Sequence, residues 1–228
     1  RYETCRAEIK KKIKAGDTIG WAGGYGNFGL DVATYDSRVK NPFISPERYR
    51  FPNLQGICFL DLYSGILKDS LYDKILDPDG RKKITEPRCG SVAQDILGTV
   101  QGEWFIGNIS ADQAEREGKV LSIVHFELEP PSGIIATSGT LVPSPGMLAF
   151  APRHEGFINR EPSEIKDSNV YCFQHEQSER MVAAYSSATP FPGRILVQLI
   201  DTKTLKAEYQ EKKCNDNSNF NSPIIYER

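Results

Sequence analysis

Hydrophobic and polar residues alternate along the second half of the chain in a pattern that predicts β-strands. In residues 120–128, Val124 and Phe126 point one way while Leu121 and Ile123 point the other. A period of two places successive side chains on opposite faces of a strand. Similar runs, separated by turns rich in proline, glycine or charge, predict about eight strands, at residues 100–106, 120–128, 133–141, 147–151, 170–174, 181–186, 194–201 and 205–210.

The connections between these predicted strands are short, which favours antiparallel neighbours. We therefore expect residues 99–228 to form an antiparallel β-barrel or a two-sheet sandwich. Closure into a barrel is attractive because it leaves no strand edge unpaired.

The middle of the chain, residues 46–98, has a different pattern. Leu67, Leu71 and Ile75 are spaced four residues apart, which predicts one short helix. The helix should end before residues 77–80, where proline and glycine favour a turn. We expect this stretch to connect the N-terminal residues to the β domain.

Composition and charge narrow the function only slightly. Of the 228 residues, 39% are apolar and 25% are charged, which is typical of a soluble protein with a core. The net charge of -2 creates no field that would attract nucleic acid, so no nucleic-acid partner is expected. No run approaches the roughly 18 apolar residues that a membrane span needs. Because the sequence starts at Arg1 without a signal peptide, we interpret it as a processed or internal part of a longer product.

The five cysteines predict disulfides, because no two form a C-x-x-C pair that would indicate a structural zinc site. We favour Cys58 with Cys89 and Cys172 with Cys214, since each pair brackets a compact segment, although spacing alone leaves the connectivity open. Disulfides would indicate a periplasmic or secreted protein. Cys5 is then left over and suggests a partner outside the chain. The alternative is five buried free thiols in a cytosolic protein.

The N-terminal residues contain a turn, Lys14-Ala15-Gly16-Asp17-Thr18-Ile19-Gly20, followed by a glycine-rich loop and a strand. This order resembles the end of the catalytic β-sandwich of lysostaphin-type zinc endopeptidases, where a K-x-G-D-x-I-G turn precedes a strand carrying His-x-His. Here Leu30 and Val32 occupy the two histidine positions, and neither side chain can bind metal. The resemblance implies a β-sandwich element in residues 1–45 without catalytic residues or metal, and with its other strands upstream.

A second resemblance concerns Gly102-Glu103-Trp104, which is similar to the G-x-W of the first strand of lipocalins. Lipocalins are eight-stranded barrels that hold small apolar molecules. The resemblance implies Trp104 as a candidate ligand-binding residue, with a basic residue from near the last strand packed over it. Arg194 and Lys206 are both candidates for that role. The alternative is a tryptophan that fills one end of the barrel core.

The three histidines indicate no catalytic residue. His125 and Glu127 share a strand face with Glu129 and are candidate binding residues for a metal or polar ligand, the alternative being a solvated polar stripe. His154 and His175 lie in loop-like segments without a Ser or Cys signature for a triad. A glycosidase-type pair of acids stays open, because the fold rather than the spacing brings such carboxylates together.

The sequence therefore predicts a mostly β exported protein, with a β-sandwich element at residues 1–45, a connector with one short helix at 46–98, and a β domain at 99–228. The chain also looks like uncharacterised bacterial envelope proteins with a non-catalytic lysostaphin-like domain and an end similar to residues 220–228. Our leading interpretation is a binding or structural module of the envelope that contacts another protein chain or a glycan, without cofactor or metal. The alternatives are a lipocalin-like carrier of a small apolar ligand and a zinc metallopeptidase whose ligands lie upstream.

Overall fold

The structure is a computed structural model of the chain. It divides into two units, Arg1–Ala33 and Thr34–Arg228, which are described separately. The described residues are 10, 12–14, 16–18, 20, 32–76, 80–127, 133–137, 139–142, 146–176, 192–215 and 218–228.

In the first unit, the described residues include a turn at residues 14–17. The Asp17 amide donates to the Lys14 carbonyl at 3.0 Å, and the Lys14 amide donates to the Asp17 carboxylate at 2.8 Å. Gly16 lies inside this turn with φ of 92°, a conformation that glycine adopts without strain. Cys5 and Leu30 lie outside the described residues, and so does most of the expected sandwich element.

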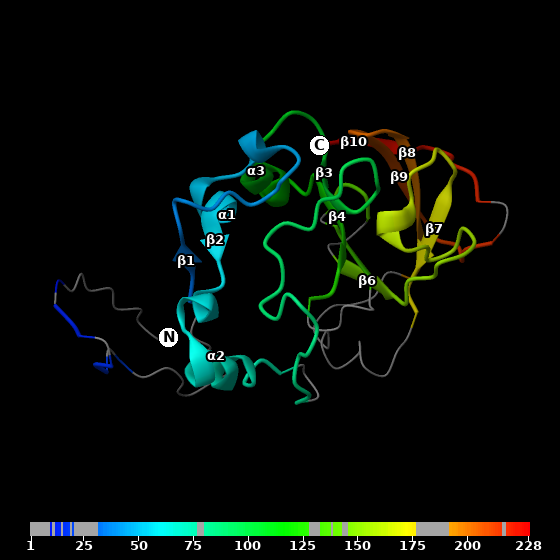
Figure 1. Cartoon of the computed structure of the whole chain (residues 1–228). Coiled ribbons are helices and arrows are strands. Elements are labelled where there is room, and N and C mark those ends of the chain that lie inside the picture. Colours follow the sequence, from blue (N-terminus) through cyan, green and yellow to red (C-terminus); the bar gives the residue numbers. More distant parts are fainter. Residues whose placement is uncertain are drawn as a thin grey trace, which may run out of the picture. The chain divides into compact units, whose positions relative to one another are not determined.

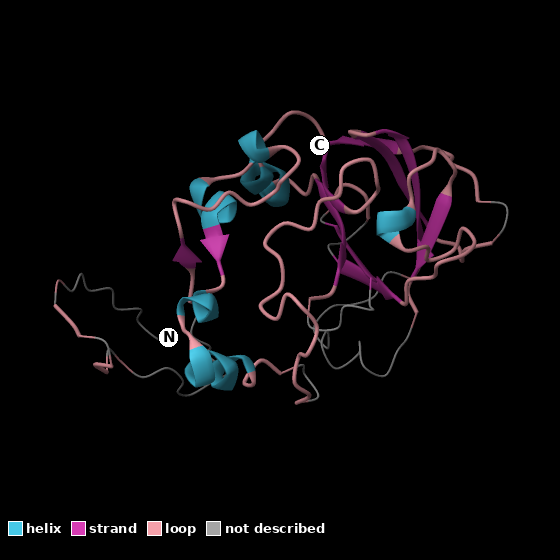
Figure 2. Cartoon of the chain, in the orientation of Figure 1, coloured by secondary structure: helices cyan, strands magenta, loops and turns pink. Residues whose placement is uncertain are grey.

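The second unit contains an eight-stranded antiparallel sheet that forms a nearly closed barrel, shown in magenta in Figure 2. In the sheet order β6-β5-β4-β3-β10-β9-β8-β7, the first of these strands along the chain pairs with the last. The prediction of a mostly β protein with an antiparallel barrel is confirmed. The strands are β3 (Gly102–Phe105), β4 (Val120–His125), β5 (Gly133–Thr137), β6 (Gly146–Phe150), β7 (Tyr171–Gln174), β8 (Arg194–Asp201), β9 (Thr204–Gln210) and β10 (Ile224–Glu227).

Several strands are shorter than predicted, since β3 spans 102–105 rather than 100–106, β4 ends at His125 and β5 at Thr137. Two further differences concern whole strands. The expected strand at residues 181–186 lies outside the described residues. β10 was not predicted, because four residues after a segment rich in asparagine and serine give too short an alternation to recognise. It nevertheless completes the sheet by pairing with both β9 and β3.

The barrel approaches closure between β6 and β7, the two ends of the sheet order. The Glu176 amide donates to the Ala149 carbonyl at 3.0 Å, and the Phe150 and Phe173 rings pack with centroids 5.0 Å apart. Gly133 opposes Phe150 across the β5–β6 pair, and a Cβ atom at Gly133 would overlap the Phe150 ring. Glycine at this position therefore lets a large aromatic side chain fill the interior.

The barrel interior is packed with side chains from every strand. Tyr171 and Leu199 keep 6% and 5% of their surface exposed, and the other strand residues of this core have none, as expected of a packed protein interior. These fully buried residues are Trp104, Leu121, Ile123, Ile135, Leu148, Phe150, Phe173, Ile195, Val197, Leu205, Ala207 and Tyr226.

Short elements precede the barrel, drawn from blue to cyan in Figure 1. All of them lie in the connector at residues 46–98 except a two-residue strand at residues 34–35. The predicted helix is present as α2 (Gly65–Tyr72), shorter than the apolar spacing suggested because Ile75 lies beyond its end. The remaining elements, including a small helix that the pattern did not predict, are β1 (Thr34–Tyr35), η1 (Pro46–Arg48), α1 (Phe51–Gln55), β2 (Gly56–Ile57) and η2 (Phe59–Leu62), with β1 and β2 paired antiparallel. Two further short helices lie in connections between barrel strands: α3 (Ala111–Arg116) follows β3, and η3 (Pro162–Glu164) follows β6.

Both predicted disulfides are present. Cys58 pairs with Cys89 and Cys172 with Cys214, with Cα atoms 5.9 Å and 5.7 Å apart. The first ties the connector to the loop before β3, and the second ties the segment after β9 to β7. Two disulfides are typical of a protein that folds in an oxidising, extracytoplasmic compartment. Within the described ranges, no helix has the length and apolar character needed to span a bilayer.

Candidate functional site

Trp104 fills one end of the barrel core. Its indole nitrogen donates to the Val100 carbonyl at 2.9 Å, and the ring has no exposed surface. The basic residue over the ring is Arg228, with its guanidinium carbon 3.9 Å from the ring centroid. Arg194 and Lys206, which the sequence suggested for this role, alternate with inward-facing residues of β8 and β9 and therefore face away from the core.

Arg228 also binds the loop that closes this end of the barrel. Its guanidinium donates to the carbonyls of Ile96, Thr99 and Gln101 at 3.0, 2.6 and 2.8 Å. Burial lowers the pKa of Arg228 to about 10, so the group remains charged at neutral pH. Trp104 is therefore covered by a cation and by packed side chains.

The candidate residues His125 and Glu127 lie together at the end of β4, where they hold the loop before β3. Glu127 accepts hydrogen bonds from the Ser91 amide at 2.8 Å and from the Gln94 side chain at 2.9 Å. Gln94 also exchanges two hydrogen bonds with the backbone of His125, as a neighbouring strand would. Both candidates line a cavity of about 310 Å³, whereas Glu129 lies outside the described residues.

The His125 ring contacts the carboxylate of Glu161, with Nε2 3.0 Å from Oε2. Burial acts to raise the pKa of Glu161, but hydrogen bonds from His125 and from the amide and hydroxyl of Ser163 outweigh it and lower the pKa to about 2. The contact therefore holds a charged carboxylate between β4 and η3.

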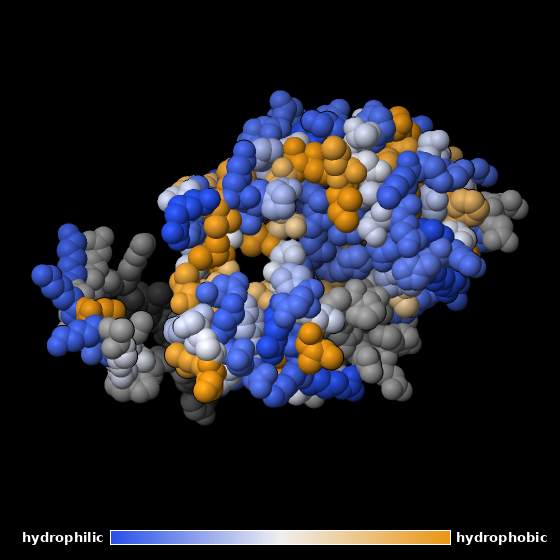
Figure 3. Space-filling view, in the orientation of Figure 1, coloured by the Kyte–Doolittle hydropathy of each residue, from blue (hydrophilic) through white to orange (hydrophobic). Residues whose placement is uncertain are grey.

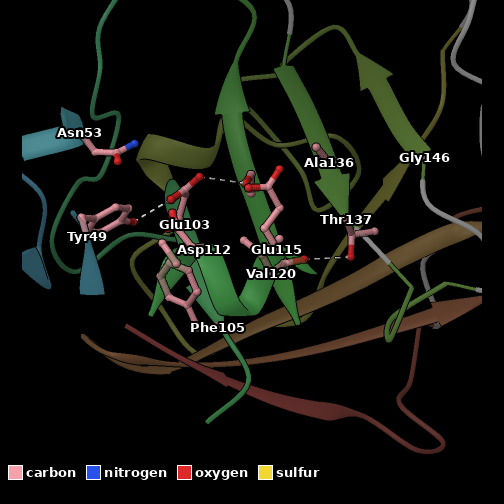
Figure 4. A pocket seen from close by; sticks show the side chains of 12 residues that line it. Tyr49, Asn53, Glu103, Phe105, Asp112, Glu115, Val120, Ala136, Thr137 and Gly146 are labelled. Atoms are coloured by element: carbon pink, nitrogen blue, oxygen red, sulfur yellow. Dashed lines mark hydrogen bonds between the residues drawn. The ribbon is translucent and has the colours of Figure 1, made fainter. Parts of the chain in front are cut away.

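A different pocket, on the outer wall of the barrel, gathers acidic side chains (Figure 4). We call it the Glu103 pocket; its volume is about 340 Å³. Because Trp104 faces the core, its strand neighbours Glu103 and Phe105 face outward, toward the connector and α3. The lining residues are Tyr49, Asn53, Glu103, Phe105, Ala111, Asp112, Glu115, Val120, Ser122, Ala136, Thr137 and Gly146.

Hydrogen bonds fix the orientation of the Glu103 carboxyl group. The Tyr49 hydroxyl donates to Oε2 at 2.7 Å and the Ser122 hydroxyl to Oε1 at 3.4 Å, and Figure 4 shows Tyr49 and Glu103 pointing toward one another. Tyr49 is itself held by stacking on Phe43, with ring centroids 3.9 Å apart. The carboxyl group is therefore presented to the pocket by aromatic packing from the connector.

Burial raises the pKa of Glu103, and the negative charges of Asp95 and Glu115 act in the same direction, against the two hydrogen bonds. Burial raises the pKa of Tyr49, and the charge of the Glu103 carboxyl group and its hydrogen bond act in the same direction. Asp112 forms an ion pair with Arg50. The pocket thus contains more negative charge than its own residues neutralise, and it favours a cationic group.

The sequence pattern does not predict the Glu103 pocket, because Glu103 stands there only as the middle residue of G-x-W. A signal was nevertheless present: if Trp104 points into the core, the neighbouring carboxylate must lie on the outer face of the strand, next to the large apolar side chain of Phe105. The histidines lie apart, with His125 on Glu161, His154 on Glu164 and His175 near the Ala149 amide. In the part of the chain that the structure describes, no group of three or more His, Cys, Asp or Glu side chains is arranged to hold a metal ion.

The geometry and charge of the Glu103 pocket are the observations from which we propose a function. Comparisons of the chain with known protein families, with curated proteins and with solved structures found no match.

Proposed function

We propose that this protein is a non-catalytic binding module of the bacterial envelope, periplasmic or secreted, and that the Glu103 pocket receives a lysine or arginine side chain of a protein partner. The observation that supports this proposal is the convergence of Glu103, Asp112 and Glu115 on one open pocket. The two disulfides support export.

A cation in the pocket would relieve two unfavourable interactions. It would stabilise the charged form of Glu103, which burial disfavours, and it would offset the repulsion between Glu103 and Glu115. The partly exposed side chains of Tyr49, Val120 and Ala136 line the same pocket and offer apolar contact to the methylene stem of a lysine or arginine. A basic side chain therefore matches both the charge and the shape of the wall.

The packed barrel interior supports a site on the outer wall. Core residues such as Trp104, Phe150 and Tyr226 have no exposed surface, and they leave the described interior positions filled rather than open to a ligand. A lipocalin-like carrier would need space for an apolar molecule within the barrel, and a zinc metallopeptidase would need metal ligands from residues outside this sequence. Both alternatives stay predictions, and our proposal concerns the Glu103 pocket on the outer face of the barrel.

The proposal is tested by NMR titration of the full chain with N-acetyl-lysine methylamide and N-acetyl-arginine methylamide, with N-acetyl-glutamine methylamide as the neutral probe. We expect the cationic probes to shift the amide resonances of Ala111, Ser122 and Ala136, and the neutral probe to leave them unchanged. Chitotetraose is titrated in parallel, because a glycan is the other partner class that the sequence suggested.

Two variants test the carboxylates directly. Glu103→Gln and Glu115→Gln should each weaken binding of the cationic probes about tenfold, which is the scale of losing one partly buried charge partner. Glu117→Gln is the matched control, since Glu117 lies just beyond α3 and pairs with Lys119. The proposal is wrong if chitotetraose shifts these resonances and the cations do not, or if no probe does.

A further inference from the structure

A third cavity lies against the connector. It shares no residue with the Glu103 pocket, and it shares Lys83 and Glu127 with the cavity beside His125. We call it the Lys83 cavity; its volume is about 370 Å³. Phe59 and Leu60 of η2, Leu71 of α2 and Ile75 form its apolar wall. Hydrophobic side chains also gather on the surface over the connector, in orange in Figure 3, and Ile66 of α2 is 89% exposed. The volume is within the range of small-molecule sites.

The charged wall of this cavity contains a buried lysine, Lys83, whose ammonium group has a single hydrogen-bond partner among the described residues. Lys83 is 4% exposed, and its ammonium group donates to Glu127 Oε2 over a long distance of 3.5 Å. Glu127 already accepts from Ser91 and Gln94 through its other oxygen. A buried ammonium group with one long contact is costly, because it has lost water without gaining equivalent acceptors.

Arg88 adds a second donor to the same wall. One terminal nitrogen of its guanidinium donates to Asp73 at 3.1 Å, and the group lies 4.9 Å from the centroid of the Tyr72 ring. Its Nε atom is buried and has no hydrogen-bond partner in the part of the chain that the structure describes. Lys74 lines the cavity as well, so its lining includes three cationic side chains and one carboxylate, while Asp73 pairs with Arg88 from outside the lining.

We propose that the Lys83 cavity binds a small amphipathic carboxylate, such as a medium-chain fatty acid. The carboxylate would accept hydrogen bonds from Lys83 and Arg88, and the alkyl chain would cover Phe59, Leu60 and Leu71. Such a ligand supplies what the cavity lacks, an anionic acceptor at one end and apolar contact along the rest. This inference is independent of the proposed function, since the two sites are separate.

The Cys58–Cys89 disulfide connects the two walls of this cavity. Cys89 lines it, and Cys58 immediately precedes Phe59. The crosslink therefore fixes the loop that carries Lys83 and Arg88 relative to the apolar wall formed by Phe59 and Leu60. Reduction of this bond should weaken ligand binding even where the barrel remains folded.

The test is isothermal titration calorimetry of the full chain with octanoate, 1-octanol and octylamine. We expect octanoate to bind at least tenfold more tightly than octanol, and octylamine not to bind. Lys83→Met should weaken octanoate binding at least tenfold and leave the weak affinity for octanol unchanged. The matched control is Lys82→Met, which removes a neighbouring lysine that pairs with Asp73 at the surface.

Two further variants keep the test decisive if Lys83→Met does not fold. Lys83→Arg keeps the positive charge and should retain octanoate binding, whereas Leu71→Trp should block the cavity and abolish it. The proposal is overturned if octanol binds as tightly as octanoate, if Lys83→Met or Leu71→Trp binds octanoate like the original chain, or if millimolar octanoate releases no heat of binding.

Discussion

Arg228 covers Trp104, with its guanidinium carbon 3.9 Å from the ring centroid, and so joins the end of the sequence to the strand that begins the barrel. The same group reaches the Gln101 carbonyl, 127 residues away along the chain. Gly102 permits this approach, because its φ of 128° is a glycine conformation and a Cβ atom there would overlap the Asp95 carboxyl group. One cation therefore organises the closing loop, the core tryptophan and the last strand.

Removal of this cation should destabilise the barrel strongly. Arg228→Ala would remove the donor to the Thr99 carbonyl, take one of the donors from the Ile96 and Gln101 carbonyls, and expose the Trp104 ring. We expect a loss of about 3 kcal/mol in the free energy of unfolding. Arg228→Lys should recover only part of it, because an ammonium group cannot reproduce the planar fork. Urea unfolding followed by tryptophan fluorescence measures both changes. Arg38→Ala, at an exposed arginine, is the control and should leave the midpoint unchanged.

The Glu161 carboxylate should make stability depend on pH in the acid range. Its pKa in the folded protein is about 2, below the ordinary 4.5, so its stabilising contribution is complete above about pH 4.5 and is lost as the pH falls toward 2. The shift corresponds to at most about 3 kcal/mol. Urea unfolding between pH 2 and 7 measures this slope. Glu161→Gln should flatten it, and an unchanged slope in that variant would contradict the assignment.

The charge of Glu103 should destabilise the folded protein, whereas the charge of Glu161 stabilises it. Because burial raises its pKa in the folded state, ionisation of Glu103 destabilises the protein as the pH rises through that value. Glu103→Gln removes the charge while Tyr49 can still donate to the amide oxygen. We therefore expect a higher urea midpoint at pH 7 together with weaker binding of cationic probes. A lower midpoint would show that the carboxylate is structural rather than poised for a ligand.

The two disulfides should stabilise the protein by similar amounts but affect different parts of it. They close segments of 31 and 42 residues, for which chain entropy predicts about 3 to 4 kcal/mol each. Cys172→Ser with Cys214→Ser should lower the unfolding midpoint of the barrel. Cys58→Ser with Cys89→Ser should instead increase amide hydrogen exchange in the connector. Peptide mapping without reductant checks the pairing, and any mixed pairing would contradict it.

The strand pattern was readable because alternation in a barrel wall is local. β8 matches its predicted residues 194–201, and β9 differs from its prediction by a single residue, because each strand repeats apolar side chains every second position. The disulfides were also predictable, since each pair brackets one compact segment. The sequence does not predict β10, because Ile224–Glu227 is too short to show a period of two. Its strand conformation depends on pairing with β9 and β3.

The sequence by itself determined that this chain would build antiparallel strands, cross-link itself twice and form the helix α2, because these properties depend on local spacing, whereas the short helix α1 was not predicted. Only the tertiary structure decided which charged side chains would lose their water. Lys83 and Glu127 are 44 residues apart, and Tyr49 and Glu103 are 54 apart, yet their contacts determine what each cavity can bind. Desolvation and pairing of charges are properties of the folded surroundings, so no local pattern could assign these roles.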